Sequence, residues 1–155
     1  MQTPPDASPA TPTPAGLPRR LAAAVYDALL VAALCVIPAS VVIAVRGGGP
    51  VPPGDPLLQV LLIITVGAFF IGFWTWGGQT PGMRTWRLRV ERDSGQALRP
   101  GRTLLRFAAA VPSIALFGAG IWWALIDSQR RTWPDLLART RVVVLPSKPS
   151  ARAQQ

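Results

Sequence analysis

Three stretches of the chain carry no charged residue: residues 28–45, 56–83 and 107–126. A helix needs about 20 predominantly apolar residues to cross the ~30 Å hydrocarbon core of a bilayer. The pattern therefore predicts two full membrane spans, at about residues 20–45 and 56–76, and a third apolar segment at about residues 104–126. We expect an all-α integral membrane protein, built as a small helical bundle.

The first two segments have the features of permanent spans. Basic residues 19–20 come late, and the apolar run that follows them is too long for a cleavable secretory signal, so we expect this helix to stay in the membrane. Pro38 is expected to kink the first helix without ending it. The second span ends in Phe73, Trp74 and Trp76, aromatic residues that suit the boundary between lipid and water.

The third segment, residues 104–126, permits two topologies. It is long enough for one span, but Pro112 and Gly118 can break it into two arms that return to the starting side. The loop at 84–106 holds seven Arg and two acids, and the stretch at 127–155 holds five Arg, one Lys and two acids. Because basic segments tend to stay in the cytoplasm, both stretches and the N-terminus are expected there. This distribution favours a bent, re-entrant third segment over a third crossing.

Two short stretches have strand patterns. Apolar and charged residues alternate over 86–90, and residues 141–145 form a β-branched run, so we expect a small cytoplasmic β element from the two. The Pro-rich residues 1–18 and the polar residues 146–155 are expected to be disordered tails. They flank a membrane domain at 19–145.

The composition excludes several chemistries. The 155 residues include no His and one Cys, so a His general base, a His-ligated metal, an intrachain disulfide and a cysteine metal cluster are impossible. Cys35 lies in the first apolar segment and is expected to be a packing residue. No catalytic residue, metal site or cofactor is indicated, and we expect the chain not to be an enzyme.

The charge balance points to the membrane surface. Sixteen basic residues against seven acids give a formal net charge of +9. Beside apolar spans, attraction of the basic loop to anionic lipid headgroups explains this charge more simply than nucleic-acid binding does. Trp122 and Trp123 are expected to be interfacial anchors rather than a ligand platform.

Asp27 lies about two turns inside the first span, where an ionised carboxylate costs about 2.5–3.5 kcal/mol on insertion scales. It follows Arg20 by seven residues, so the two side chains share nearly one helix face, about 10 Å apart along the axis. The carboxylate is therefore expected to face protein, water or a cation. Two roles are open: an ion or proton site, or a structural partner for an Arg on another segment.

Residues 131–135 (RTWPD) predict the start of a short helix at 133–139. Thr132 is the expected N-cap, and Asp135 is the expected acid of a capping box. Contact of Asp135 with a substrate is the alternative, and the two roles are compatible because one carboxylate oxygen can cap while the other meets an Arg.

Residues 78–82 (GQTPG) follow the second span and predict a turn. Gly78 and Gly82 supply unusual dihedrals there, and Thr80 can bond the local backbone. A phosphate-cradling loop is the weaker alternative, because the Lys and the strand–loop–helix setting of such loops are absent.

Blocks of this sequence resemble the RDD family of small bacterial membrane proteins, named for an arginine and two aspartates. Residues 20–27 (RLAAAVYD) are similar to the family's R-x-x-A-x-x-x-D helix. Residues 78–90 resemble its G-x-T-x-G-K…V block, and residues 130–144 resemble its closing R-Q-T-x-H-D-x-x-A-G-T-x-V-V block. Residues 101–106 also fit the family's segment before the third apolar region. The resemblance covers about residues 19–145.

The resemblance implies that Arg20, Asp27 and Asp135 are the signature residues. We expect them to form a polar network with Arg106 and Arg131. The chain departs from the family pattern at three positions, with Met83 in place of Lys, Pro134 in place of His and Arg139 in place of Gly. Losing the Lys and the His removes two titratable groups, which weakens a proton-relay mechanism.

Two functions are open. In the first, suggested by the family, the protein takes part in transport of a cation or other small solute handled by Asp27; two or three spans are few for a transporter, so a homo-oligomer is implied. In the second, the protein is a non-catalytic membrane scaffold, whose Arg/Asp network is structural and whose basic cytoplasmic face binds lipids or a partner. For both functions we expect a multi-pass protein of the cell membrane, with the N-terminus in the cytoplasm as the basic segments indicate. No feature identifies a substrate.

Overall fold

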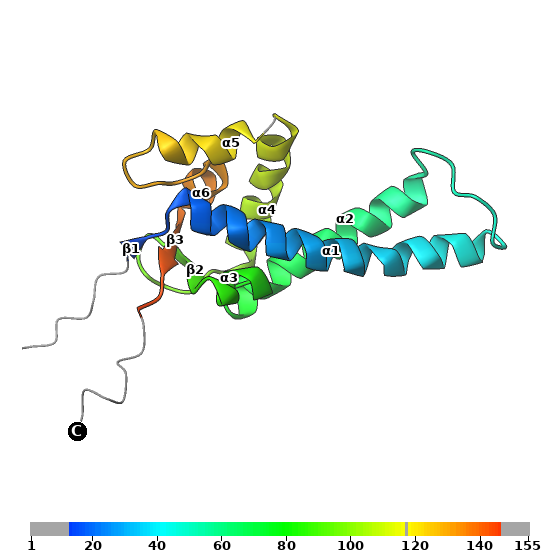
Figure 1. The fold of residues 1–155 in the computed structure, drawn as a ribbon, viewed down its shortest axis with the longest axis horizontal. Helices are drawn as coiled ribbons and strands as arrows, with labels where there is room; N and C mark the ends of the chain where they lie inside the picture. Colours follow the sequence, from blue (N-terminus) through cyan, green and yellow to red (C-terminus); the bar gives the residue numbers. More distant parts are fainter. Residues whose placement is uncertain (1–12, 117, 147–155) are drawn as a thin grey trace, which may run out of the picture.

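The computed structural model describes residues 13–116 and 118–146. It contains two long helices, several short ones and a small sheet (Figure 1). The helices are α1 (Leu17–Val45), α2 (Pro56–Trp76), α3 (Pro81–Thr85), α4 (Pro100–Ala115), α5 (Ala119–Trp122), the 3-10 helix η1 (Trp123–Leu125) and α6 (Trp133–Ala138). The strands are β1 (Thr13–Pro14), β2 (Leu88–Arg92) and β3 (Thr140–Val144).

Helices α1 and α2 are both long and apolar enough to cross a membrane, which confirms the two predicted spans. With 29 residues, α1 is about 44 Å long, more than the hydrocarbon core requires. It continues through Pro38. Large apolar side chains on both helices, such as Leu29 and Ile63, are exposed. Such a surface is stable only against lipid or another apolar partner.

The start of α2 is defined by Asp55. This N-cap residue accepts a hydrogen bond from the backbone N–H of Leu58 at 2.8 Å, and Pro56 at the first helical position needs no acceptor. Asp55 also forms an ion pair with Arg46, which follows the last residue of α1. The two charges of the loop between the spans therefore neutralise each other.

The sheet has the strand order β1–β3–β2, and both pairings are antiparallel. The pairing of β2 with β3, with Val90 opposite Val142, is the predicted β element. The prediction that the N-terminal tail extends to residue 18 is wrong, because Thr13–Pro14 pairs with β3 and α1 begins at Leu17. The physical reason is that the free edge of β3 offers unpaired backbone groups, and the N–H of Ala15 bonds to the carbonyl of Val142 at 2.9 Å. The expected tails at 1–12 and 147–155 lie outside the described residues.

The third apolar segment is bent. Helix α4 and the α5–η1 unit meet at an angle of 108°. Gly120 permits this close return, since a Cβ at that position would lie 2.3 Å from Oγ of Ser113 on α4. The bend brings the following chain back to β3, which pairs with both β1 and β2 at one end of the α1–α2 hairpin (Figure 1). The structure therefore has the bent form rather than a straight third crossing.

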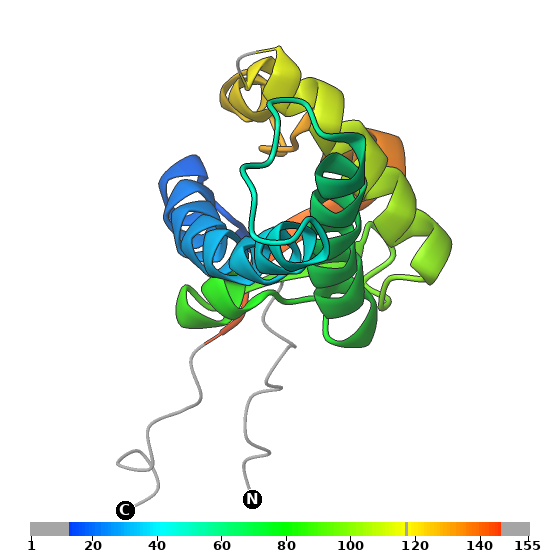
Figure 2. The ribbon, with the colours of Figure 1, turned by 90° about the vertical axis from the view of Figure 1, so that its right-hand side faces the viewer.

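The remaining elements pack around that same end of the hairpin, which we call the sheet end. Figure 2 looks along the hairpin from its loop and shows α3 on one side of the α1–α2 pair, with α4 and α5 on the other. The hydrophobic core lies here, between the sheet and the helix ends. Its buried members are Ala15, Ala23, Trp74, Leu88, Val90, Leu98 and Val142.

Candidate functional site

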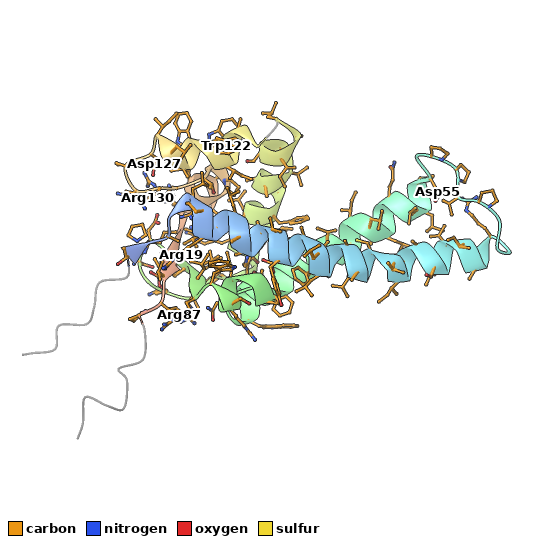
Figure 3. All side chains as sticks on the ribbon, in the orientation of Figure 1. Arg19, Asp55, Arg87, Trp122, Asp127 and Arg130 are labelled. Atoms are coloured by element: carbon orange, nitrogen blue, oxygen red, sulfur yellow. The ribbon has the colours of Figure 1, made fainter. Side chains whose placement is uncertain are left out.

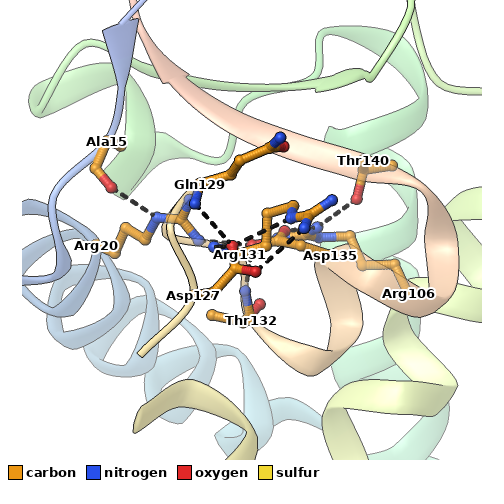
Figure 4. A network of polar contacts seen from close by, with 9 residues as sticks. All are labelled: Ala15, Arg20, Arg106, Asp127, Gln129, Arg131, Thr132, Asp135 and Thr140. Carbon is orange, nitrogen blue, oxygen red and sulfur yellow. Dashed lines mark hydrogen bonds and ion pairs between the residues drawn. The ribbon is translucent and has the colours of Figure 1, made fainter. Parts of the chain in front are cut away.

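Asp135 is the centre of a buried ionic cluster and is 0% exposed. One carboxylate oxygen, Oδ2, accepts hydrogen bonds from Nη1 of Arg20 at 2.6 Å and from the backbone N–H of Thr132 at 2.9 Å. The other oxygen, Oδ1, accepts from Nη1 of Arg106. The same Arg106 nitrogen donates to Oγ1 of Thr140 at 2.8 Å. We call these five residues the Asp135 cluster (Figure 4).

The cluster joins elements that are far apart in the sequence. Arg20 comes from α1, Arg106 from α4, Asp135 from α6 and Thr140 from β3. Arg20 also donates from Nε to the carbonyl of Ala15 at 3.2 Å, beside β1. The network therefore ties the first span to the bent third segment and to the sheet.

Local sequence positions Asp135 for this role. Thr132 is the N-cap of α6 and Asp135 is its third helical residue, so the carboxylate reaches back to the cap as in a capping box. Pro134 occupies the first turn of the helix, where it costs no backbone hydrogen bond. The remaining lone pairs of the carboxylate are then available to the two arginines.

The charges of the cluster are coupled. Burial raises the pKa of Asp135, but the positive charges of Arg106 and Arg20 outweigh this effect and hold the pKa below its ordinary value of 3.8. Asp135 is therefore ionised at neutral pH. Arg106 also lies over the ring of Trp74, with its guanidinium carbon 5.0 Å from the ring centroid, a cation–π contact.

Asp27 forms a second, separate polar site, the Asp27 clasp, with Thr80 and Gly82. Its side chain accepts hydrogen bonds from the hydroxyl of Thr80 at 2.5 Å and from the backbone N–H of Gly82 at 2.8 Å. Asp27 is 3% exposed. Among the described residues it has no ion pair. The clasp fixes the start of α3 against the middle of α1.

The turn at 78–82 requires its two glycines for different reasons. A Cβ on Gly82 would lie 2.3 Å from the carbonyl oxygen of Ala23, so only Gly allows α3 to approach α1 this closely. Gly78 has a φ of +66°, and its carbonyl accepts from the N–H of Val90 at 2.7 Å. Thr80 caps α3 by accepting from the N–H of Met83 at 3.2 Å. The turn therefore links both α1 and β2 to the end of α2.

The predicted network of Arg20, Asp27, Arg106, Arg131 and Asp135 is wrong in two respects. Asp27 does not meet an arginine, because the segment packed against its face of α1 is the 78–82 turn. Arg131 does not bind Asp135 either. It pairs with Asp127, through Nε and Nη2 at 3.1 Å each. The chain turns between Asp127 and Arg131, and this turn places the Arg131 guanidinium beside the carboxylate of Asp127 rather than that of Asp135.

The pairing of Asp127 with Arg131 was not predicted, and the only signal for it is their spacing of four residues. Hydrogen bonds from the side chain and backbone of Arg131 lower the pKa of Asp127 to about 2. Thr140 was also missed as a ligand of Arg106. The sequence feature that could have indicated this contact is the position of Thr140 directly before the β-branched run, where β3 begins beside α6.

Both carboxylates are buried: Asp27 is 3% and Asp135 is 0% exposed. A cavity of about 120 Å³ lies elsewhere, between the end of α2 and β2. It is lined by Thr75, Trp76, Gly77, Gly78, Arg89, Val90, Glu91, Gly95, Gln96 and Ala97. Within residues 13–116 and 118–146, no three Cys, Asp or Glu side chains gather as metal ligands do.

Comparison with known proteins identifies the family. The model of the RDD family matches residues 14–139, which contain both spans, the Asp27 clasp and most of the Asp135 cluster. No curated protein matches the chain, and no solved structure does. With its two apolar spanning helices, the chain is an integral membrane protein, and it belongs to the RDD family.

Proposed function

We propose that the protein is a non-catalytic membrane scaffold that holds a basic surface against anionic lipid headgroups. The observation that carries this proposal is that both signature carboxylates, Asp135 and Asp27, accept hydrogen bonds from the protein itself. Asp135 accepts from Arg20, Arg106 and Thr132, and Asp27 accepts from Thr80 and Gly82. Every carboxylate oxygen thus has a donor from the protein itself, as expected of groups that hold segments together.

The distribution of charge supports the lipid part of the proposal. Seven exposed arginines form no ion pair within the described chain; we call them the basic face. They are Arg19, Arg84, Arg87, Arg89, Arg99, Arg130 and Arg139. Figure 3 labels three of them, Arg19, Arg87 and Arg130, at the sheet end, far from Asp55 in the loop between the spans. Each basic residue near an anionic surface contributes about 1 kcal/mol of attraction. The positive-inside rule orients this end toward the cytoplasm.

A test of the lipid part compares the lipids that the protein retains. The protein is reconstituted in bilayers with equal amounts of phosphatidylglycerol and phosphatidylcholine, extracted in mild detergent, and its bound lipids are quantified. We expect phosphatidylglycerol to be enriched. Combined Arg84→Gln, Arg87→Gln and Arg89→Gln substitutions should reduce the enrichment, whereas Arg46→Gln at the opposite end should not. Equal retention of both lipids by the unsubstituted protein would contradict the proposal.

Transport of a cation or other small solute is a second candidate, favoured by one specific observation. Asp27 lies within a span, and its two partners are neutral groups, so no residue of the described chain neutralises its charge by an ion pair. A carboxylate of this kind marks many ion pathways. With two spanning helices per chain, such a pathway requires an oligomer.

Flux measurements separate the two candidates. Proteoliposomes are assayed for Na⁺, K⁺ and H⁺ movement with the unsubstituted protein and with Asp27→Asn, which keeps the shape of the side chain. The scaffold proposal expects both to behave as empty vesicles do. Flux that is present in the unsubstituted protein and lost in a folded Asp27→Asn variant would favour transport instead.

A further inference from the structure

The cavity between the end of α2 and β2 has room for a ligand group. Its volume of about 120 Å³ is about ten times the ~10–15 Å³ that one water molecule needs, so a group of several non-hydrogen atoms fits there. Three segments form its walls: residues 75–78 at the end of α2, residues 89–91 of β2, and residues 95–97 of the following loop. None of the lining residues belongs to the Asp135 cluster or to the Asp27 clasp.

The charge of the cavity wall favours an anion. Two charged residues line the cavity, Arg89 and Glu91. Glu91 is neutralised by Arg141, whose Nη2 lies 2.8 Å from Oε1 of Glu91. Arg89 forms no ion pair with any described residue, so its positive charge is uncompensated. The Arg89 side chain lies over Gly78, since a Cβ at Gly78 would be 3.4 Å from Nε of Arg89.

Two further side chains supply hydrogen-bond donors at the same cavity. Oε1 of Gln96 accepts from Nη1 of Arg92 at 2.7 Å, which leaves the two amide N–H groups of Gln96 as donors at the wall. Arg84 lies at the rim, because its Nη2 would be 3.5 Å from a Cβ at the lining residue Gly77. Arginine N–H groups match the oxygens of a phosphate especially well. This set of donors is therefore suited to a phosphodiester, which carries one negative charge.

Trp76 indicates that the cavity lies at the level of lipid headgroups. It lines the cavity from the last turn of α2 and is 91% exposed. A Trp at the end of a spanning helix is typical of the boundary between lipid and water. Its ring lies back along α2, 4.0 Å from the position of a Cβ at Gly72. A lipid with its phosphate in the cavity can therefore extend its acyl chains along α2 into the bilayer.

We infer that this cavity binds the phosphodiester headgroup of one anionic phospholipid, with Arg89 and Gln96 contacting the phosphate oxygens. The inference rests on the lipid part of the proposed function, to which it adds a defined site and a stoichiometry of one lipid per chain. A choline headgroup brings a bulky cation close to Arg89, whereas a glycerol headgroup brings no charge. Phosphatidylglycerol should therefore bind more tightly than phosphatidylcholine does.

The test counts the lipids bound to the delipidated full chain in neutral detergent, by native mass spectrometry, as lipid is added. We expect one phosphatidylglycerol per chain to bind saturably before any further lipid. Arg89→Gln should weaken its apparent affinity about tenfold, the loss of one hydrogen bond to a charged group. Arg46→Gln, in the loop between the spans, should leave the affinity unchanged. Inorganic phosphate that displaces the bound lipid would assign the cavity to a free anion and overturn the inference.

A variant that fills the cavity separates this site from the basic face. Ala97 lines the cavity, whereas Ser94 in the same exposed loop does not. Ala97→Leu changes no charge and should abolish the one-to-one binding, and Ser94→Leu should retain it; the Tm of each lipid-free variant checks its fold. Equal lipid binding by Ala97→Leu and Ser94→Leu would overturn the inference.

The two proposals fail in different ways. Arg87 belongs to the basic face but does not line the cavity. Equal weakening of lipid binding by Arg89→Gln and Arg87→Gln would therefore overturn the defined site and leave the proposed function, which needs only the basic face. Equal binding of phosphatidylglycerol and phosphatidylcholine by the unsubstituted protein would overturn both.

Discussion

The carboxylate of Asp27 accepts a hydrogen bond from the backbone N–H of Gly82, 55 residues further along the chain, at 2.8 Å. This contact joins the first span to the turn that follows the second span. It depends on the absence of a side chain at Gly82, since the backbone of α1 occupies the place of a Cβ. The signature aspartate of the span and the glycine of the turn therefore form one structural unit.

Gly82→Ala should destabilise the protein. Its Cβ would lie 2.3 Å from the carbonyl oxygen of Ala23, and a backbone atom in a packed helix cannot move aside cheaply. We expect the free energy of unfolding to fall by about 3 kcal/mol, the upper part of the range for overpacking. The control is Gly101→Ala, because no atom lies within 4 Å of a Cβ at Gly101. Thermal unfolding in detergent measures both, and equal Tm values for the two variants would contradict the role of Gly82.

Asp135→Asn should be more harmful than the same change at Asp127. Loss of the buried charge leaves Arg20 and Arg106 without a counter-charge, and breaking a buried ion pair in this way costs about 3–5 kcal/mol. Asp127→Asn removes the partly exposed ion pair with Arg131, and the expected loss in the free energy of unfolding is small. Chemical unfolding monitored by tryptophan fluorescence compares the two. Similar losses of stability would show that the Asp135 cluster contributes no more than a surface pair.

The Asp135 cluster also predicts a loss of stability in acid. The pKa of Asp135 is lower in the folded protein than its ordinary value of 3.8, because of Arg106 and Arg20. The unfolded chain therefore binds the proton more readily than the folded protein does. The stabilisation is fully present above 3.8 and is lost as the pH falls through that value toward the folded pKa.

Tm measured from about pH 6 down to about pH 3 tests this dependence. The unsubstituted protein should lose stability more steeply than Asp135→Asn, which has no carboxyl group to protonate there. Asp127→Asn should also reduce the steepness, because the pKa of Asp127 is lowered to about 2 as well, but by less than Asp135→Asn does, since the Asp127–Arg131 pair is more exposed to solvent. Parallel curves for the unsubstituted protein and Asp135→Asn would rule out this carboxylate as the source of the acid sensitivity.

The sequence predicted the spans well because each is encoded locally. A run of apolar residues without charges predicts a span wherever its partners lie, so α1 and α2 were located closely. Strand β1 has only two residues, in a Pro-rich stretch, and exists because β3 offers it an edge. No local pattern distinguishes such a strand from a tail.

The candidate site was predicted only in part, because only its local contacts are encoded by neighbouring residues. The helix-face argument showed that Arg20 and Asp27 point in nearly one direction, but it carries no information on which segment packs opposite each of them. In the structure, α6 packs opposite Arg20 and the 78–82 turn packs opposite Asp27. The capping position of Asp135 was predictable because Thr132 and Asp135 are neighbours, whereas its contact with Arg106 depends on tertiary packing.

Arg139→Gly should stabilise the protein. Arg139 is the C-cap of α6 and has a φ of +50°, a left-handed conformation that costs an ordinary residue about 1–2 kcal/mol. The same position carries Gly in the family pattern that the sequence resembles, as expected where the backbone is left-handed. Allowing for the greater freedom of Gly in the unfolded chain, we expect a gain of roughly 0.5–1 kcal/mol. Arg139→Ala is the control, because it removes the side chain but keeps the strain, and a similar gain in both variants would assign the effect to charge.

The sheet predicts which segments share a side of the membrane. Strands β1, β2 and β3 are hydrogen-bonded to one another, so the chain on either side of the bent third segment has to lie on the same side as the N-terminal end of α1. Single cysteines introduced in a Cys35→Ser background test this relationship, at three exposed loop positions: Pro53→Cys, Asp93→Cys and Ser128→Cys. A thiol reagent that does not cross membranes should label Asp93→Cys and Ser128→Cys from the same side, and Pro53→Cys from the other.

The informative position is Ser128, which follows the bend. If the third segment crossed the membrane, Ser128→Cys would be labelled together with Pro53→Cys, and β3 could not pair with β2 without breaking the sheet. The five backbone pairings between these strands, from Leu88 opposite Val144 to Arg92 opposite Thr140, make that alternative costly. Labelling of Ser128→Cys from the side of Pro53→Cys would therefore contradict the fold itself, and with it the contact of Arg106 with Thr140 on which the Asp135 cluster depends.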